Sequence, residues 1–323
     1  MRGLFLKKKK LATASLVAGE SGMVSVVLPV HNGAALLRQA VESCIAQEFR
    51  QWELIIVDDA STDETPLIIE AFVQSDSRIR SLTARQNVGL PAALNMGFGV
   101  ARGEFYTWTS DDNCFRPNCL GVLAAELRAH PAVDLVYSNY TTIDAAGVEG
   151  SHINVLAPEN LVERNCIGSS FMFRRNVFKV LGGYDKGLFL VEDYDFWLRA
   201  SCHFKFMPVH QDLYLYRLHE SSLTERRRDE VIAMTESLLE RRIVEMQWVG
   251  RHRQATALMN IAERCRRRSN ISGVKRLFWK AFFLSPSEVF RHGDILPVLS
   301  LVIGYRLACL LTGAKSQMGG LRT

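Results

Sequence analysis

Segments with the hydrophobic pattern of buried strands alternate with helical patterns along the first half of this 323-residue chain. Residues 24–30 and 52–57 are apolar runs, and residues 34–47 between them place apolar side chains at helical spacing. This order predicts parallel strand pairing, and so an α/β fold with a mostly parallel sheet flanked by helices. Further strands are predicted at 79–82, 105–109 and 134–138, and further helices at 91–101, at 116–130 and after the capping-box signature of Ser61 and Glu64.

Two pairs of adjacent carboxylates follow predicted strands. Asp58-Asp59 follows residues 52–57, and Asp111-Asp112 follows residues 105–109. Ligands of open α/β sheets bind beyond the carboxyl ends of the strands, so both pairs are expected at one binding edge. Adjacent like charges at a low-dielectric rim repel each other, and a divalent cation is the simplest way to make the arrangement favourable. We interpret Asp111-Asp112 as a metal and phosphate site; the alternative is a turn with two solvated acids.

The composition indicates a folded protein with free thiols. With 48% hydrophobic residues, the chain can bury one large core, or a core and a smaller accessory domain. Its seven cysteines are an odd number without a Cys-x-x-Cys pair, so free thiols in a reducing compartment are expected instead of a disulfide framework.

The charge is distributed unevenly. Residues 1–22 carry five Lys/Arg and one Glu, residues 225–323 carry eighteen Lys/Arg and nine Asp/Glu, and the residues between them have a net charge of −8. Basic ends on an acidic body favour an anionic partner. No nucleic acid is expected, because aromatic residues are not interleaved with the basic ones in the tail, so a membrane surface is the favoured partner. Residues 1–22 imitate a secretory signal poorly, and a flexible or membrane-touching basic leader is expected.

Residues 225–323 are predicted to form basic helices. Residues 231–249 and 256–268 have helical spacing with arginines on the polar face. Residues 295–311 are an apolar run interrupted by a proline, a glycine and an arginine, which is marginal against the ~20 residues that cross a bilayer core. Two alternatives stay open: the run lies in a membrane interface, or it packs back as part of an accessory domain.

Five motifs succeed one another in the strand and helix pattern. They are Val24-Ser-Val-Val-Leu-Pro-Val-His-Asn32, Glu53-Leu-Ile-Ile-Val-Asp-Asp-Ala-Ser-Thr-Asp63, Asn87-Val-Gly-Leu-Pro-Ala-Ala-Leu-Asn95, Ala101-Arg-Gly-Glu104 and Thr109-Ser-Asp-Asp112. Their order and spacing resemble those of the family 2 glycosyltransferases with the GT-A fold. The resemblance covers residue 24 to about residue 224. It implies a Rossmann-like GT-A domain at residues 23–224, between the leader (1–22) and the helical region (225–323), and an inverting enzyme that uses a nucleotide-sugar donor.

For the donor nucleotide, the resemblance implies that Asp59 accepts the imide N–H of a uracil through a charge-assisted hydrogen bond. Pro29 and His31 would border the base; relatives often carry Tyr at the position of His31, and an imidazole keeps a stacking surface. Asp58 either assists or caps the helix that follows.

The resemblance also implies a metal cofactor. Asp112 would ligate Mg²⁺ or Mn²⁺ bridging the donor diphosphate, because such ions take oxygen ligands and are completed by substrate phosphates. Asp111 would contact the ribose or the water shell of the metal. Many relatives have Asp-x-Asp-Asp where this chain has Thr109-Ser-Asp-Asp112, so one carboxylate is missing and the division of roles between Asp111 and Asp112 stays open.

The family places its catalytic base in the segment Glu192-Asp-Tyr-Asp-Phe-Trp-Leu-Arg199, where Asp193 is the matching residue. A helix N-terminus favours an ionised carboxylate, which deprotonates the acceptor hydroxyl in an inverting transfer. Glu192 either orients the acceptor or serves the helix terminus. Asp195 is expected to form an ordinary ion pair with Arg199.

Three further residues are candidates for contacts with the sugar, the acceptor or the diphosphate. Asp185, in Gly182-Gly-Tyr-Asp185, either touches sugar hydroxyls or serves a turn. Arg217 and His219 match the Tyr-Arg-x-His segment of the family, which implies contact with the diphosphate or the metal.

Together these features predict an inverting, metal-dependent transferase. It would move a sugar from a nucleoside-diphosphate sugar, with UDP expected, to a hydroxyl of a glycan or lipid-linked acceptor in bacterial polysaccharide biosynthesis. The expected location is cytoplasmic and peripheral, at the inner face of the membrane. One alternative is a sugar nucleotidyltransferase, but its first loop needs a Gly-rich sequence with Lys or Arg, which His31-Asn-Gly-Ala-Ala-Leu36 lacks. The other is a non-catalytic membrane-associated scaffold, suggested by the missing carboxylate.

Overall fold

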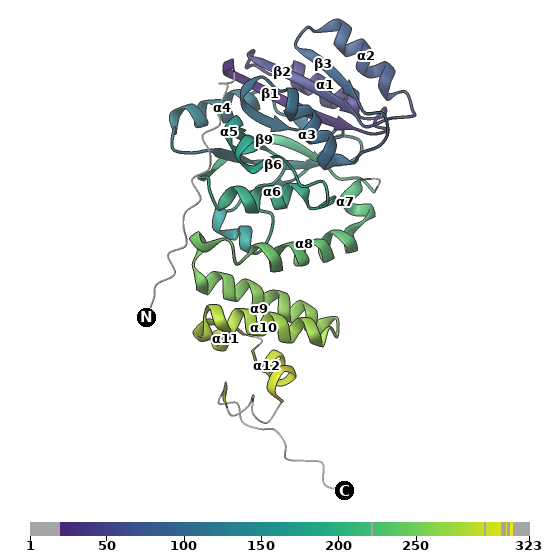
Figure 1. The fold of residues 1–323 in the computed structure, drawn as a ribbon. Coiled ribbons are helices and arrows are strands. Elements are labelled where there is room, and N and C mark those ends of the chain that lie inside the picture. The colour runs from purple at the N-terminus through teal and green to yellow at the C-terminus, as the bar shows by residue number, and fades with distance from the viewer. Residues whose placement is uncertain (1–19, 221, 294, 305–307, 309–310, 313–323) are drawn as a thin grey trace.

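The structure is a computed structural model that describes residues 20–220, 222–293, 295–304, 308 and 311–312. Over these residues, a sheet covered by helices is followed by a stack of helices (Figure 1). The strands are β1 Glu20–Val30, β2 Trp52–Asp58, β3 Ile79–Thr83, β4 Gly103–Trp108, β5 Cys114–Phe115, β6 Leu135–Ile143, β7 Glu149–Ile153, β8 Phe171–Arg174 and β9 Phe206–Arg217. The helices are α1 Leu37–Ile45, α2 Thr65–Ser75, α3 Leu90–Val100, α4 Cys119–Ala129, α5 Arg175–Leu181, α6 Glu192–Ser201, α7 Leu223–Arg226, α8 Arg228–Arg242, α9 Arg251–Arg267, α10 Ile271–Leu284, α11 Pro286–Arg291 and α12 Ile295–Ile303, with 3-10 turns η1 Pro158–Val162 and η2 Gln247–Val249. Nearly all of the predicted leader, residues 1–19, lies outside the described residues.

The described strands form one mixed sheet in the order β3-β2-β1-β4-β8-β6-β9-β5, with β7 beside β6. β3, β2, β1 and β4 are mutually parallel, whereas β8 runs antiparallel to β4 and β6. The parallel half therefore brings the carboxyl ends of β1, β2 and β4 to one edge, where both predicted acid pairs lie. The predicted α/β sheet is confirmed.

Alternate residues of the central strands face two separate cores. Val26 and Leu28 of β1 belong to a core formed with α1, α2 and α4, whereas Val27 belongs to the core formed with α3. Because helices cover both faces, the parallel strands are largely apolar, and all seven residues of β2 are buried, including Glu53 and Asp58. Cys44 and Cys119 lie in the first of these cores as free thiols, as predicted.

The predicted capping box at Ser61 and Glu64 is wrong. α2 begins at Thr65, and the Ser61 Oγ accepts the backbone N–H of Asn32 at 2.9 Å. The Oδ1 of Asp63 accepts the N–H of Thr65 at 3.0 Å and so supplies the hydrogen bond at the helix start. Ser61 instead joins two loops at the carboxyl edge of the sheet.

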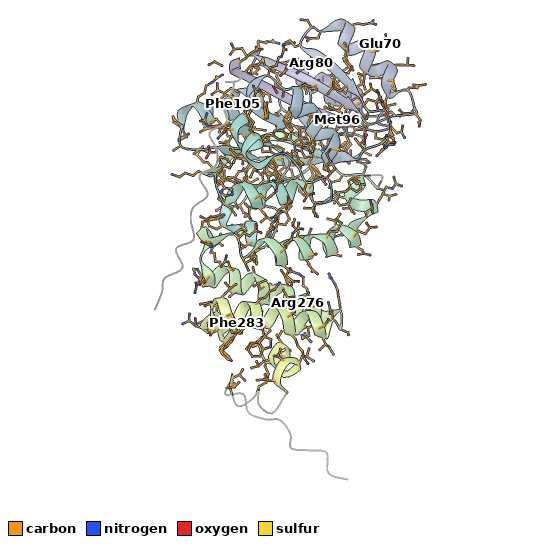
Figure 2. All side chains as sticks on the ribbon, in the orientation of Figure 1. Glu70, Arg80, Met96, Phe105, Arg276 and Phe283 are labelled. Carbon is orange, nitrogen blue, oxygen red and sulfur yellow. The ribbon has the colours of Figure 1, made fainter. Side chains whose placement is uncertain are left out.

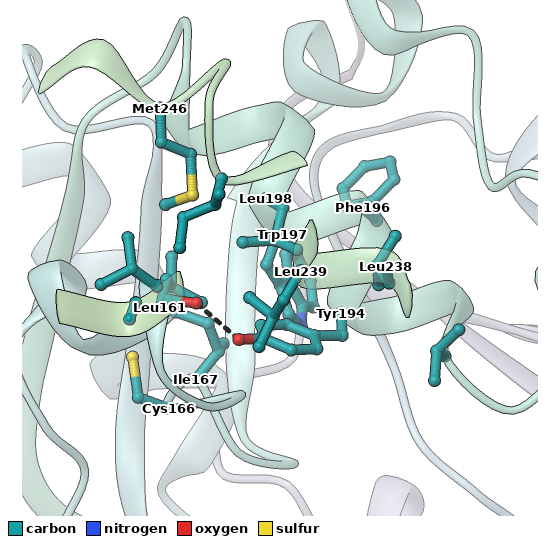
Figure 3. Close-up of a cluster of buried hydrophobic side chains, with 14 of the residues drawn as sticks. Leu161, Cys166, Ile167, Tyr194, Phe196, Trp197, Leu198, Leu238, Leu239 and Met246 are labelled. Atoms are coloured by element: carbon teal, nitrogen blue, oxygen red, sulfur yellow. Dashed lines mark hydrogen bonds between the residues drawn. The ribbon is translucent and has the colours of Figure 1, made fainter. Parts of the chain in front are cut away.

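α6 joins the sheet to the C-terminal helices (Figure 3). Its Tyr194 and Trp197 are buried beside Leu238 and Leu239 of α8, and the Tyr194 hydroxyl donates to the carbonyl oxygen of Leu161. The same hydrophobic core continues into α9, α10 and α12. The C-terminal region is therefore helical, as predicted, and is built onto the sheet through α6.

Much of the positive charge of the C-terminal region is paired internally. Glu236 of α8 forms ion pairs with Arg264 and Arg268 at 2.8 and 2.7 Å. One turn further along α8, Glu240 pairs with two cations of α10, Arg276 (Figure 2) and Lys280, each at 2.7 Å. These pairs connect α8 to the helices that follow it.

The described part of the apolar run at 295–311 packs against other helices. Ile295, Val298 and Leu299 of α12 are buried, and α12 contacts α9, α10 and α11. In the described part of the chain, every helix is too short or too polar to traverse a bilayer. For residues 295–303 the structure supports the accessory-packing alternative.

Candidate active site

Asp111 and Asp112 lie in the turn after β4, at the carboxyl edge of the sheet. The Oδ2 of Asp112 is 3.0 Å from the Nε2 of His219, whereas its buried Oδ1 finds no hydrogen-bond partner among the described residues. Burial, and then the charge of Asp112, raise the pKa of Asp111 to about 7. A divalent cation would use the free oxygen and offset the repulsion, so these residues fit Mg²⁺ or Mn²⁺.

The protein supplies only part of a metal shell at this turn. Nowhere in the described residues do three His, Cys, Asp or Glu side chains form a group that could hold a metal. Thr109, at the position where many relatives carry the first Asp, is buried, and its Oγ1 lies 2.6 Å from the hydroxyl of Tyr214. The missing carboxylate is thus replaced by a structural hydrogen bond, and waters and substrate phosphates would complete the shell.

Gly33 allows the first loop to close over Asp111. A Cβ at Gly33 would lie 2.0 Å from the Oδ2 of Asp111 and 2.6 Å from the Cγ2 of Val30, so no side chain fits there. The loop is held by Gly33 N–H, which donates to the Oγ1 of Thr65 at 3.0 Å, and Asn32 before it has a φ of 55°. The close approach places the loop against the acid pair.

The residues predicted for the nucleotide lie next to this loop. Pro29 is buried in β1 opposite Val57, and the ring Nδ1 of His31 donates to the carbonyl oxygen of Asp59 at 2.8 Å. The buried Asp59 carboxylate accepts the backbone N–H groups of Val88 and Gly89 at 2.7 and 2.8 Å. Asp59 therefore fixes the loop at 87–89, and its contact with a base stays a prediction.

Asp58 serves a turn. Its Oδ1 accepts the backbone N–H of Ser61 at 2.9 Å, and the side chain is buried. From the sequence, Asp58 is expected either to assist in nucleotide binding or to cap the helix that follows. The structure supports a capping role, but the N–H that Asp58 caps belongs to a turn and not to α2.

Arg217 braces the Asp111-Asp112 turn from β9. Its Nε donates to the carbonyl oxygen of Asp112 at 2.9 Å, and its Nη2 donates to the Oε1 of Gln39 at 2.8 Å. Its Nη1 donates to the carbonyl oxygens of Asp144 and Ala145 at 2.9 and 3.1 Å. The residue is 2% exposed. Each guanidinium nitrogen is thus already committed to the protein, which differs from the expected contact with a diphosphate.

Glu192 and Asp193 form a second acid pair, at the start of α6. Glu192 is 4% exposed and its Oε2 has no partner among the described residues; burial, and then the charge of Asp193, raise its pKa to about 8. Burial also raises the pKa of Asp193. Two hydrogen bonds to the carboxylate lower this pKa in part: Oδ1 accepts the N–H of Tyr194 at 2.6 Å, and Oδ2 accepts the Nδ2 of Asn165 at 2.8 Å. Burial thus favours the protonated form of both acids, which titrate as a coupled pair.

One member of each acid pair contributes to the electrostatics of Tyr216. Burial comes first among the causes that raise the pKa of Tyr216 to about 12, and the charges of Asp112 and Asp193 both contribute. Tyr216 lies on β9, and its ring centroid is 5.9 Å from that of Tyr140. The charges of the candidate metal ligand and of the candidate base thus both raise the pKa of the Tyr216 hydroxyl, although the two acids are far apart in sequence.

Asp185 lies in an exposed turn, where its Oδ1 accepts the N–H of Gly187 at 2.9 Å. The turn is anchored on α3: Asn95 exchanges two hydrogen bonds of 2.8 Å with the backbone of Tyr184. Gly183, with a φ of 88°, allows this, because a Cβ there would lie 2.4 Å from the Oδ1 of Asn95. The structure thus shows the turn role of Asp185, and contact with a sugar stays a prediction.

The ion pair predicted between Asp195 and Arg199 is confirmed, with an Nε to Oδ2 distance of 2.6 Å. Arg199 also donates from Nη1 to the carbonyl oxygen of Leu181 and from Nη2 to that of Gly183, at 3.1 and 2.8 Å. The pair therefore holds α6 against the end of α5 and the turn that follows.

Sequence reasoning missed Gln39, Asn113 and Asn165. The Oδ1 of Asn113 accepts the backbone N–H of Arg217 at 2.7 Å. Gln39 accepts a hydrogen bond from the Arg217 side chain, and Asn165 donates one to the Asp193 carboxylate. Their partners lie 28 to 178 residues away, and no local pattern marks such contacts. Gly33 did carry a signal, because Asn-Gly after a strand marks a tight turn.

Residues 25–182 match the family model described as glycosyl transferase family 2. The putative glycosyltransferase EpsE of Bacillus subtilis is 29% identical over 223 residues, which cover 67% of this chain and 80% of that protein. The match covers only 33%, 66% and 32% of the length of three curated relatives, the uncharacterized glycosyltransferases of Rickettsia felis, Rickettsia typhi and Rickettsia conorii.

Two solved structures share the architecture. S. aureus TarS 1–349, in complex with UDP-GlcNAc, has a TM-score of 0.65 at 16% identity, and the match covers 91% of this chain and 93% of that chain. The mannosyltransferase PcManGT from Pyrobaculum calidifontis, in complex with GDP-Man and Mn²⁺, has a TM-score of 0.58 at 14% identity, with 91% and 87% covered. Identities this low concern the fold alone, and the likeness confirms the predicted GT-A architecture with its C-terminal helices.

Proposed function

The domain at residues 25–182 belongs to glycosyl transferase family 2, and from this premise we propose that the protein transfers a sugar from a nucleoside-diphosphate sugar to a hydroxyl of a glycan or lipid-linked acceptor. One observation carries the proposal: the buried Oδ1 of Asp112, beside Asp111 at the carboxyl edge of the sheet, has no hydrogen-bond partner among the described residues, and the charges of Asp112 and Asp193 both contribute to the raised pKa of Tyr216. A metal-activated leaving group and a base belong on opposite sides of one reacting carbon.

Asp112 and Asp111 would hold Mg²⁺ or Mn²⁺ against the donor diphosphate. When bound, the ion supplies charge stabilisation for the departing diphosphate. The solved structures of the same fold were obtained with UDP-GlcNAc, and with GDP-Man and Mn²⁺, which supports a diphosphate donor of this kind. We assign His219 to orient Asp112, and Arg217 to brace the turn through the Asp112 carbonyl.

Asp193 would accept the proton of the acceptor hydroxyl. Asn165 holds its Oδ2 and the Tyr194 N–H holds its Oδ1, so the carboxylate is aimed before the acceptor arrives. Burial keeps its pKa raised, which brings its basicity closer to that needed near neutral pH. The acceptor oxygen would then bond to the anomeric carbon as the bond to the diphosphate breaks, with inversion at that carbon.

The donor base would lie between His31, Pro29 and the loop at 87–89 that Asp59 fixes. UDP is the proposed nucleotide, with Asp59 near the uracil imide. Asp185 and Glu192 would border the sugar or the acceptor. Association with the inner face of a membrane is part of the proposal, because a lipid-linked acceptor is found there.

Donor turnover tests the proposal. The parent, Asp112→Asn and Asp193→Asn are incubated with UDP-sugars, with and without Mn²⁺, and UDP release is measured. Asp229→Asn, an exposed acid of α8, is the matched control. We expect Mn²⁺-dependent release by the parent and the control and a loss of at least about a hundredfold in both site variants. Equal rates in all four proteins would refute the assignments, and pyrophosphate release from UTP and a sugar phosphate would support a nucleotidyltransferase.

A further inference from the structure

The outer face of α10 exposes large apolar side chains. Ile271, Trp279 and Phe283 are 49%, 43% and 78% exposed. With the exposed Lys275 they repeat every four residues and form one stripe along the helix. The opposite face is already buried in the core, through Val274, Leu277, Phe278 and Ala281. A helix that served only this core would be apolar on one side.

Three exposed rings gather around the half-buried ring of Phe282 and form with it what we call the aromatic platform (Trp279, Phe282, Phe283 and Phe290). Ring centroids are 5.6 Å apart for Trp279 and Phe282, 6.0 Å for Phe282 and Phe283, and 6.3 Å for Phe282 and Phe290. Phe290 comes from α11 and is 40% exposed. Both helices lie at the end of the molecule away from the sheet (Figures 1 and 2). A contiguous exposed aromatic surface marks an interaction site.

The surroundings of the platform are basic. α10 itself carries three cations, Lys275, Arg276 and Lys280, and no Asp or Glu. Lys275 lies on the exposed stripe, and Arg276 and Lys280 beside it share the single carboxylate of Glu240. Two cations on one carboxylate leave net positive charge at the rim, which complements a negatively charged partner.

We propose that the aromatic platform binds an anionic lipid bilayer. The rings of Trp279 and Phe283 enter the boundary between headgroups and acyl chains, and Lys275 contacts lipid phosphates. Indole suits this boundary because it combines an apolar ring with a hydrogen-bond donor. The aromatic platform is thus the surface through which the membrane association of the proposed function would occur. The proposal rests on the proposed function only in that a lipid-linked acceptor requires the protein to be at a membrane.

A second copy of this chain fits the platform less well. Most homodimers are two-fold symmetric, and such a contact would place the same patch on both sides. The basic residues around Lys275 would then face their own copies, and like charges brought together oppose association. A bilayer containing anionic lipid has the opposite charge and satisfies both the apolar and the basic part of the surface.

Vesicle sedimentation tests the proposal with the full chain. The vesicles contain phosphatidylcholine alone or phosphatidylcholine mixed with phosphatidylglycerol. We expect the parent to sediment with the anionic vesicles and less so at high salt. The double variant Trp279→Ser/Phe283→Ser is expected to bind at least about tenfold more weakly. Lys275→Glu is expected to weaken binding to the anionic vesicles, and Leu67→Ser, a control at an apolar residue of α2 that is 69% exposed, to leave it unchanged.

Three outcomes would overturn the proposal. In the first, the double variant sediments with the anionic vesicles as well as the parent does. In the second, the parent does not sediment with anionic vesicles. In the third, analytical ultracentrifugation shows that the parent is a dimer and that the double variant is a monomer. Mn²⁺-dependent UDP release in solution needs no vesicle, so it separates the two proposals. If the parent released no UDP, the result would count against the proposed function alone. If the double variant released UDP like the parent, its active site would be intact.

Discussion

Arg242 of α8 and Asp195 of α6 form a buried ion pair, in which the Arg242 Nε donates to the Asp195 Oδ1 at 2.9 Å. Asp195 is fully buried, and its other oxygen is taken by Arg199. The helix that begins with Glu192 and Asp193 is thereby fastened to the C-terminal helices on one side and to the turn after α5 on the other.

Replacement of Arg242 by Ala is expected to destabilise the protein strongly. It would leave the buried Asp195 with Arg199 and with the more distant, half-exposed Arg241, and removing one partner of a buried pair costs up to about 3–5 kcal/mol. Arg241→Ala is the matched control, because its Nη2 lies 3.9 Å from the same Oδ1 and its side chain is 52% exposed, so about 1 kcal/mol or less is expected. Urea unfolding of both variants measures the difference; similar midpoints would contradict the prediction.

Gly33→Ala is expected to weaken Mn²⁺-dependent UDP binding at least about tenfold, because the new Cβ would displace the Asp111 carboxylate from its place. Gly99→Ala controls for the change of residue type. Gly99 is an exposed helical position with nothing within 4 Å of its added Cβ, and a gain of about 0.5–1 kcal/mol in stability is expected there. Titration calorimetry measures the binding, and an unchanged affinity in Gly33→Ala would show that the loop adapts.

Glu192→Gln is expected to stabilise the protein at alkaline pH. The pKa of Glu192 is raised from 4.5 to about 8, so the folded state holds this proton more tightly than the unfolded state. The folded state therefore loses stability as pH rises from about 4.5 toward about 8, and glutamine abolishes that loss. Relative to the parent, the variant should gain more than about 1 kcal/mol between about pH 5 and about pH 9 in urea unfolding. The exposed Asp229→Asn should show no such trend.

Asn165→Ala is expected to shift the acidic limb of the activity profile upward. The Nδ2 of Asn165 donates to the Asp193 Oδ2 at 2.8 Å and favours the ionised carboxylate, so its loss raises the pKa of Asp193 further. Activity should fall several-fold more on the acidic side of the profile than on its alkaline side, because the neutral carboxyl cannot accept the proton of the acceptor. Asn160→Ala, which removes a bond to the Ala157 carbonyl, is the control. An equal loss on both sides of the profile would indicate a purely structural role.

The fold could be predicted from the sequence because the hydrophobic pattern that indicates strands and helices is local. Residues 26–30 of β1 and 54–57 of β2 are apolar because both faces of the sheet are covered, and the acid pairs lie at the ends of β2 and β4. The capping box at Ser61 failed because a hydroxyl bonds whichever donor folding brings near, and here that donor is the N–H of Asn32. Local pattern does not contain that information.

Site roles that depend on distant contacts were not predictable. The Tyr-Arg-x-His segment located Arg217, but its partners are backbone carbonyls of other loops and Gln39, 178 residues away. Asn165 is recognised only once folding places it beside Asp193. Residue type and motif thus located the acids, whereas the tertiary structure alone shows what orients them.

The carboxylate of Asp59 holds the amides of Val88 and Gly89 through hydrogen bonds within the protein itself. The conformational entropy of that loop is therefore lost during folding and not when a donor arrives. A nucleotide entering beside His31 meets a preorganised wall, so this part of the pocket is expected to recognise its ligand by rigid complementarity and not by ordering of the loop.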